Sequence, residues 1–182
     1  MTLDIDAAKY GLLQSVVNHD NYARSIRRFQ EAEILLPTFA QLSDPSSIPE
    51  EILSKLEDID PNEAHPLNLF RVHWYNTFGS AQQTALPDHI VLPKELTGVD
   101  AQIVLLFGNR FPMIGAHKVL AAYSCFLPRV VSGQFNPSMH RAIWPSTGNY
   151  ARGGIAISTL MQSRGVAVLP ENMSKERFDW LD

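Results

Sequence analysis

The sequence predicts an α/β protein whose parallel sheet carries helices on both faces. An apolar run at 101–108 (AQIVLLFG) has the length of a buried strand. A helix-forming apolar run follows it, and residues 140–170 then have the pattern of strand, helix and strand. Successive strands joined by single helices pair in parallel through right-handed crossovers, and this pattern gives the fold class.

Two helices are expected near the N-terminus. The first begins at its N-cap Asp20 and ends near Pro37. The second, residues 46–60, opens with Ser47 and Glu50 at the spacing of a capping box. Its apolar residues recur at helical spacing, at Ile48, Ile52, Leu53 and Leu56.

The middle of the chain has a weaker pattern. Residues 60–100 are richer in Pro, Asn and His, and we expect irregular structure with two short strands, 69–74 (LFRVHW) and 89–93 (HIVLP). The predicted organisation is therefore an N-terminal helical and irregular extension, 1–100, followed by the α/β core, 101–182.

Three residues mark helix ends in the predicted core. Pro128 should follow the helix that starts after residue 112, because proline interrupts the helical hydrogen bonds. Gly165 should end the helix between the last two strands, and Ser174 should cap a final short helix.

Composition indicates a soluble, globular chain. Of its 182 residues, 45% are hydrophobic and 19% are charged. The net charge is −4 and no dense run of Lys and Arg occurs, which argues against binding to nucleic acid or to an anionic membrane surface. No stretch reaches the ~20 apolar residues of a membrane span.

The single cysteine, Cys125, excludes an intramolecular disulfide framework and suits a reducing compartment. We expect its thiol in the core. The N-terminal segment carries acidic residues and no long apolar stretch, unlike a signal peptide, so a cytoplasmic location is the default expectation.

The most unusual residue of the predicted core is Lys118, inside the apolar run 113–123 (MIGAHKVLAAY). Lysine is rarely buried, because removing an ammonium group from water is costly. Partial desolvation favours the neutral amine, which is the form that acts as a nucleophile or a base. The alternative is a structural lysine whose stem lies along the helix with its ammonium in water.

A second candidate lies at 145–154 (PSTGNYARGG), between a predicted strand and a predicted helix. Ser146, Thr147 and Gly148 would present N–H groups and hydroxyls at the positive end of the helix dipole, which suits a carboxylate or a phosphate. Asn149 adds an amide donor and acceptor. An ordinary N-cap with a glycine turn is the alternative. Two glycines in the helix permit close helix–sheet packing, Gly153 and Gly154.

Other chemistry is not indicated by the sequence. Neither a Gly-x-Gly-x-x-Gly nor a Walker motif is present. Three histidines lack the compact spacing of metal ligands, so no metal site is predicted: His65, His73 and His89.

In this order, the segments resemble the pyridoxal-phosphate enzymes of fold type II, the family of cysteine synthase, threonine dehydratase and the tryptophan synthase β chain. Residues 103–122 (IVLLFGNRFPMIGAHKVLAA) are similar to the family's strand, turn and lysine helix, and GAHK is closest to the tryptophan synthase β form. The tetrapeptide STGN resembles the family's substrate-carboxylate loop. Residues 165–181 (GVAVLPENMSKERFDWL) are similar to the segment that follows in cysteine synthases.

The resemblance implies roles for the candidate residues. Lys118 would form a Schiff base with pyridoxal 5′-phosphate and then remove the substrate α-proton. Asn149 would hydrogen-bond the 3′-oxygen of the pyridine ring, and His117 would contact the phosphate. Three residues would bind the carboxylate of a small amino-acid substrate: Ser146, Thr147 and Gly148. The implied activity is a lyase or transferase reaction of amino-acid metabolism, β-elimination or β-replacement, in a cytoplasmic homodimer.

The chain also departs from the family. Trp144 and Pro145 stand where the tryptophan synthase β chain has a glutamate, which disfavours indole chemistry. The resemblance covers 101–182 well and the first hundred residues poorly, and it stops early in the family's smaller domain. We therefore expect the N-terminal portion of a fold type II enzyme, inactive alone and dependent on the remainder of the polypeptide or a complementary chain.

Two further interpretations stay open. A truncated or degenerate relative could keep the α/β core as a non-catalytic binding module. An anion-binding α/β domain could use STGN to hold a phosphate regardless of Lys118.

Overall fold

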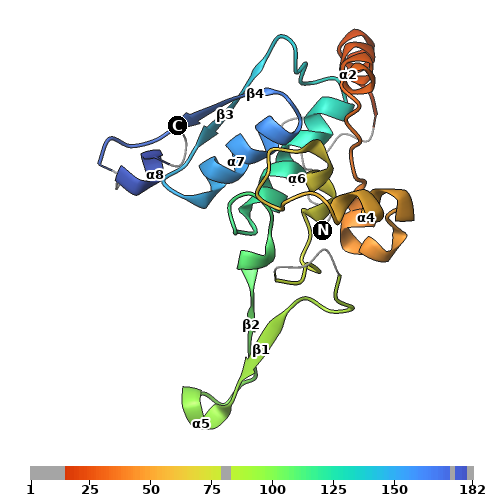
Figure 1. Cartoon of the computed structure of the whole chain (residues 1–182). Coiled ribbons are helices and arrows are strands. Elements are labelled where there is room, and N and C mark those ends of the chain that lie inside the picture. The colour runs from red at the N-terminus through yellow and green to blue at the C-terminus, as the bar shows by residue number, and fades with distance from the viewer. Residues whose placement is uncertain (1–14, 79–82, 173–174, 180–182) are drawn as a thin grey trace, which may run out of the picture.

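A computed structural model describes residues 15–78, 83–172 and 175–179. These residues form a mixed α/β structure with two small sheets (Figure 1). The α/β character predicted from the sequence is confirmed, and parallel pairing is confined to two strands within the described residues. Among those residues, no helix is long and apolar enough to cross a membrane.

The parallel sheet pairs β3 (Arg141–Pro145) with β4 (Arg164–Val168) through the connecting helix α7 (Asn149–Leu160). This strand–helix–strand unit was predicted from the pattern of residues 140–170. Gly165, however, does not end α7. Gly165 lies in β4. Helix α7 ends at Leu160 with Met161 as its C-cap, and Gln162 then adopts a left-handed backbone conformation.

Helix α7 packs tightly on both the sheet and helix α6 (Lys118–Val131). A Cβ atom at Gly154 would lie 2.0 Å from Cδ2 of Trp144 in β3, and one at Gly153 would lie 2.7 Å from the carbonyl oxygen of Lys118. The helix–sheet packing predicted for these glycines is therefore confirmed at Gly154, whereas Gly153 packs against helix α6. The Trp144 indole also donates a hydrogen bond from Nε1 to Ser158 Oγ, at 3.0 Å.

Helix α6 differs from the prediction near its C-terminal end. Pro128 lies inside the helix, which continues to Val131, so the expected stop at the proline was wrong. The Arg129 guanidinium donates to the Cys125 carbonyl at 2.7 Å beside this interruption of the helical ladder. Cys125 itself is exposed, so the prediction of a core cysteine was also wrong.

The first helix of the described chain is α2 (His19–Glu31). Its N-cap is Asn18, whose side chain accepts a hydrogen bond from Asn21 N at 3.0 Å, and not Asp20 as predicted. The helix also ends well before Pro37, because the chain turns into the left-handed region two residues after Glu31.

Three short elements follow α2: α3 (Phe39–Ser43), η1 (Pro45–Ser47) and α4 (Glu50–Leu56). The capping box predicted for Ser47 and Glu50 is absent, since Ser47 belongs to η1 and no side chain caps α4. The apolar stripe of this region is confirmed by a small buried cluster: Ile48, Ile52, Leu56 and Phe70, with Leu53 packed against it.

Residues 69–74 do not form the predicted strand. The first three of these residues belong instead to the 3-10 helix η2 (Pro66–Arg71). This helix has His65 as its N-cap and a proline as its first residue. The Nδ1 atom of His65 accepts a hydrogen bond from Leu67 N at 3.2 Å. Local side-chain bonds of this kind compete with strand pairing.

The main core takes side chains from both halves of the sequence. Before residue 100 its members include Phe29, Ile34, Leu42, Leu69 and Val72. After residue 100 they include Phe111, Val119, Ala122, Tyr123, Phe126, Val130, Trp144, Ile157 and Leu160. The N-terminal segment therefore packs directly on α6 and α7.

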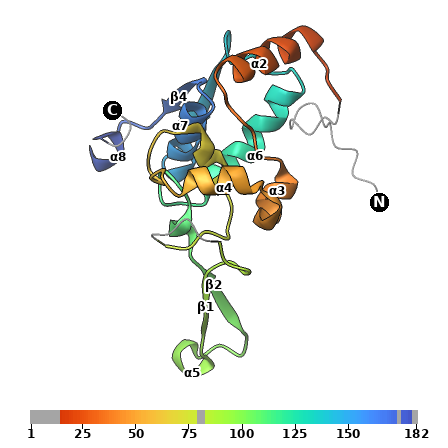
Figure 2. The same cartoon turned by 45° about the vertical axis from the view of Figure 1, so that its right-hand side comes forward.

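The second sheet is an antiparallel hairpin of β1 (His89–Leu92) and β2 (Ile103–Leu106), with α5 (Lys94–Thr97) at its tip. It extends away from the rest of the molecule (Figures 1 and 2). Both strands were predicted, but the burial and the parallel pairing expected for 101–108 were wrong, because β2 pairs antiparallel with β1. Five apolar residues of the hairpin are 43–49% exposed: Ile90, Val91, Val104, Leu105 and Leu106.

The final described helix is α8 (Lys175–Asp179), within the helix predicted after residue 174. Its predicted cap, Ser174, lies outside the described residues.

The substitution Gly154→Ala tests the packing of α7 on β3. A methyl group there would overlap the Trp144 ring, and overpacking of a core site costs about 1–3 kcal/mol. We expect the free energy of unfolding to fall by that amount in chemical denaturation. Gly148→Ala is the control, because no described atom beyond the adjoining residues lies within 4 Å of the added methyl group, and it should change stability by less than about 0.5 kcal/mol. Equal stability of the two variants would contradict this packing.

Candidate active site

The loop that leads into α6 is fastened at both ends. At its start, in the 3-10 helix η3 (Gly108–Arg110), Arg110 donates from Nε and Nη2 to the Asp88 carboxylate at 2.9 and 2.7 Å. Further on, Met113 N donates to Pro61 O at 3.0 Å. Met113 and Gly115 then adopt left-handed backbone conformations, with φ of 67° and 56°. This turn sets the position at which α6 begins.

His117 is the N-cap of α6, and its ring is held by aromatic contacts. The imidazole stacks on Trp74 with ring centroids 5.4 Å apart and an interplanar angle of 22°. Trp74 in turn meets Phe111 edge to face, at 5.0 Å and 90°. On another side lies the backbone of Gly108, where a Cβ atom would be 3.1 Å from His117 Nδ1. Stacking therefore orients this exposed histidine.

Lys118 is the first residue of α6 and its side chain is half-buried. The next residue, Val119, is fully buried in the main core, which fixes the first turn of the helix. The carbonyl oxygen of Lys118 faces Gly153 of α7 at a distance that excludes any side chain there.

The STGN segment forms the turn between β3 and α7. Ser146 N donates to Val168 O at 3.3 Å, which continues the pairing of β3 with β4. Ser146 Oγ accepts from Gly148 N at 3.3 Å. Gly148 is the N-cap of α7, and no side chain makes a capping hydrogen bond there. The alternative of an ordinary side-chain N-cap is therefore not what the structure shows.

The two predicted motifs adjoin each other. Asn149 lies four residues before Gly153, hence one turn earlier on the same face of α7. Because Gly153 touches the backbone of Lys118, the α7 N-terminus lies close to the start of α6. Asn149 is exposed, and its Oδ1 accepts from Arg152 Nη1 at 3.2 Å. Thr147 is exposed too, so the site is open to solvent on this side.

A buried polar network behind the site was not foreseen from the sequence. Arg71 donates to Leu56 O at 2.6 Å, to Ile59 O at 2.7 Å and to Asn68 Oδ1 at 2.7 Å. Asn76 donates to Arg71 O at 2.8 Å and to His73 O at 2.9 Å. The network holds the segment that carries Trp74, and so supports the stacking partner of His117. The density of Asn, Arg and His at 68–76 is the only sequence signal for it.

His73 is the buried histidine of this network, with 1% of its surface exposed. Its Nδ1 accepts from Tyr75 N at 3.1 Å. Burial lowers the pKa of His73 to about 4. Within the described residues, no group of three or more His, Cys, Asp or Glu side chains could hold a metal ion.

Comparisons with known proteins add no assignment. No family model, curated protein or solved structure matches this chain. The function must therefore be argued from the arrangement of α6, α7 and the loops around them.

The pH dependence of stability tests the burial of His73. Between pH 6.5 and about 4 the unfolded chain binds a proton at this histidine and the folded chain does not, so stability falls as the pH falls through this window. Below pH 4 this difference in proton binding lowers the free energy of unfolding by about 3 kcal/mol relative to neutral pH. His73→Asn keeps an acceptor for Tyr75 N and removes the titration. Chemical denaturation at pH 7 and 4.5 should show a clearly smaller loss for the variant, and equal losses would contradict a buried neutral histidine.

Proposed function

We propose that this chain provides the lysine-bearing part of a pyridoxal 5′-phosphate-dependent enzyme that catalyses β-elimination or β-replacement on a small amino acid. The observation that carries the proposal is the contact between Gly153 and the backbone of Lys118, which brings the start of the lysine-bearing helix α6 close to the first turns of α7. The fold type II architecture, the cytoplasmic location and a homodimeric assembly belong to the same proposal.

The donor set of the site suits this cofactor and its substrate. Lys118, a partly buried residue, provides the primary amine that an aldehyde attaches to. The side chains and N–H groups at the start of α7 lie at the positive end of its dipole and have no capping side chain, which favours a carboxylate. The Asn149 amide can donate to an oxygen of the cofactor ring.

The cofactor would supply an aldehyde and an electron sink for negative charge at the substrate α-carbon. In this proposal the chain's own residues hold the cofactor, accept the proton and orient the substrate. Lys118 holds the cofactor and then accepts the α-proton at Nζ. Ser146, Thr147 and Gly148 bind and orient the substrate carboxylate, so that the α-carbon faces the lysine. His117, fixed on Trp74, would reach toward the phosphate.

The openness of the site supports dependence on further structure. Thr147, Asn149 and His117 are exposed, whereas carbanion chemistry requires a site that excludes water. A complementary domain, from the remainder of a longer polypeptide or from another chain, would close it. A non-catalytic binding module of the same fold is the alternative, and the uncapped α7 N-terminus alone would serve it as an anion site.

Covalent trapping tests the proposed role of Lys118 without relying on turnover. After incubation with pyridoxal 5′-phosphate and reduction by borohydride, peptide mass spectrometry should find the adduct on Lys118 several-fold above any other lysine. Lys118→Ala should remove this adduct, whereas Lys94→Ala, on the exposed hairpin, should leave it unchanged. An adduct spread evenly over exposed lysines would contradict the proposal. Phosphate protection that is equal in wild type and Lys118→Ala, with no lysine adduct, would favour the anion-binding alternative.

A further inference from the structure

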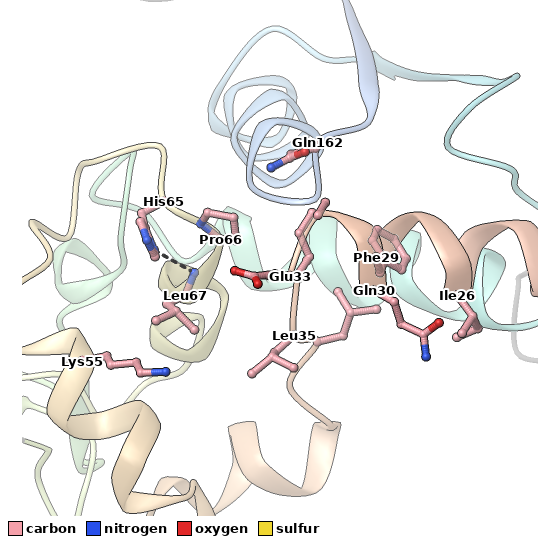
Figure 3. A pocket seen from close by; sticks show the side chains of 13 residues that line it. Ile26, Phe29, Gln30, Glu33, Leu35, Lys55, His65, Pro66, Leu67 and Gln162 are labelled. Carbon is pink, nitrogen blue, oxygen red and sulfur yellow. Dashed lines mark hydrogen bonds between the residues drawn. The ribbon is translucent and has the colours of Figure 1, made fainter.

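A separate cleft of about 970 Å³ lies where the ends of α2 and α7 meet α4 and the start of η2 (Figure 3). None of the candidate active-site residues lines it. Its apolar surface comes from Phe29, Leu35 and Leu67, among others, and Leu35 is 51% exposed although it is a large aliphatic residue. The volume falls in the range of small-molecule sites, about 300–1,000 Å³.

Two helices end at this cleft in the same way. At the end of α2, Ile34 N donates to Phe29 O at 2.8 Å, and at the end of α7, Ser163 N donates to Ser158 O at 2.7 Å. The residue enclosed by each turn is left-handed, Glu33 with φ of 54° and Gln162 with φ of 46°. Glycine is the usual residue at such a position.

The sequence thus places two long polar side chains at left-handed positions where glycine, which has no side chain, is favoured. Both Glu33 and Gln162 line the cleft (Figure 3). Arg28 donates from Nη2 to the Gln162 carbonyl and so joins the last turn of α2 to the end of α7. The backbone positions from which the two side chains project are therefore held close together by this hydrogen bond.

Opposite charges face each other across the cleft. The Glu33 carboxylate points into it from the α2 side, and the Lys55 ammonium points into it from α4 (Figure 3). Among the described residues these two groups do not form an ion pair within 4 Å. His65 uses Nδ1 to accept from Leu67 N, which leaves its other ring nitrogen as a further polar atom of the same wall.

We propose that this cleft binds a small zwitterion with an aliphatic body. The ammonium group of the ligand would pair with Glu33 and its carboxylate with Lys55. Its apolar body would cover Leu35 and Leu67 and displace water from them. Complementary charges on opposite walls favour a ligand that carries both charges over one that carries either alone. The proposal does not depend on Lys118 or on the function proposed above.

Three six-carbon probes test this site by NMR titration of the isotope-labelled chain: 6-aminohexanoate, hexylamine and hexanoate. The zwitterion should bind most tightly and shift the amide signals of residues 29–36 and 65–67. Glu33→Gln and Lys55→Gln should each weaken its binding on the order of tenfold, the loss of one charge-assisted hydrogen bond. Glu31→Gln and Lys94→Gln are matched controls outside the cleft and should bind normally.

A further variant separates binding from folding. Glu33→Gly removes the carboxylate and suits the left-handed backbone, so the protein should be at least as stable as wild type and yet bind the zwitterion about tenfold more weakly. Lys118→Ala should leave binding unchanged, so failure of the proposed enzymatic function would not affect this result. Equal affinity for all three probes, no shifts at the cleft, or unchanged binding by Glu33→Gly would overturn the proposal.

Discussion

The close approach of α7 to α6 and to β3 is the constraint on which the rest of the structure depends. Two adjacent glycines make it, because Gly153 faces the α6 backbone and Gly154 faces the Trp144 ring. A side chain at either position would push the helix away from one of its two supports. The same contact determines function in our proposal, since the distance between Lys118 and the N-terminus of α7 is set by packing of backbone on backbone, which is stiff.

A second level of organisation lies in the loops before α6. The salt bridge of Arg110 with Asp88, and the hydrogen bond from Met113 N to Pro61 O, attach these loops to distant parts of the chain. The buried Arg71 network then supports Trp74, and Trp74 supports His117. The N-terminal segment is therefore more than an extension. It supplies the surface that orients the start of the lysine helix.

Much of the local structure could be predicted from the sequence, since apolar patterns located α7 and the four strands of the described residues, although the strand predicted at 69–74 did not form. The burial of these elements could not be predicted, because it depends on residues that are distant in the sequence. The apolar run 101–108 has the pattern of a core strand but lies exposed on a hairpin. The predicted end of α7 was wrong because Gly165 lies in β4 and packs against Ser158 of the helix, and Gln162 takes the left-handed position instead. The order of motifs predicted that Lys118 and STGN belong to one site. The stacking of His117 on Trp74 could not be predicted, because the two residues are far apart in the sequence.

The hairpin of β1 and β2 differs from the rest of the molecule because its apolar side chains are exposed and not packed in a core. Neither strand pairs with a third one among the described residues, and apolar side chains are exposed along both strands. An isolated two-stranded sheet is marginally stable in water. Any structure that covered this hairpin would therefore gain hydrophobic free energy without rearranging α6, α7 or β3. Association there could lengthen the sheet and leave the geometry around Lys118 as it is.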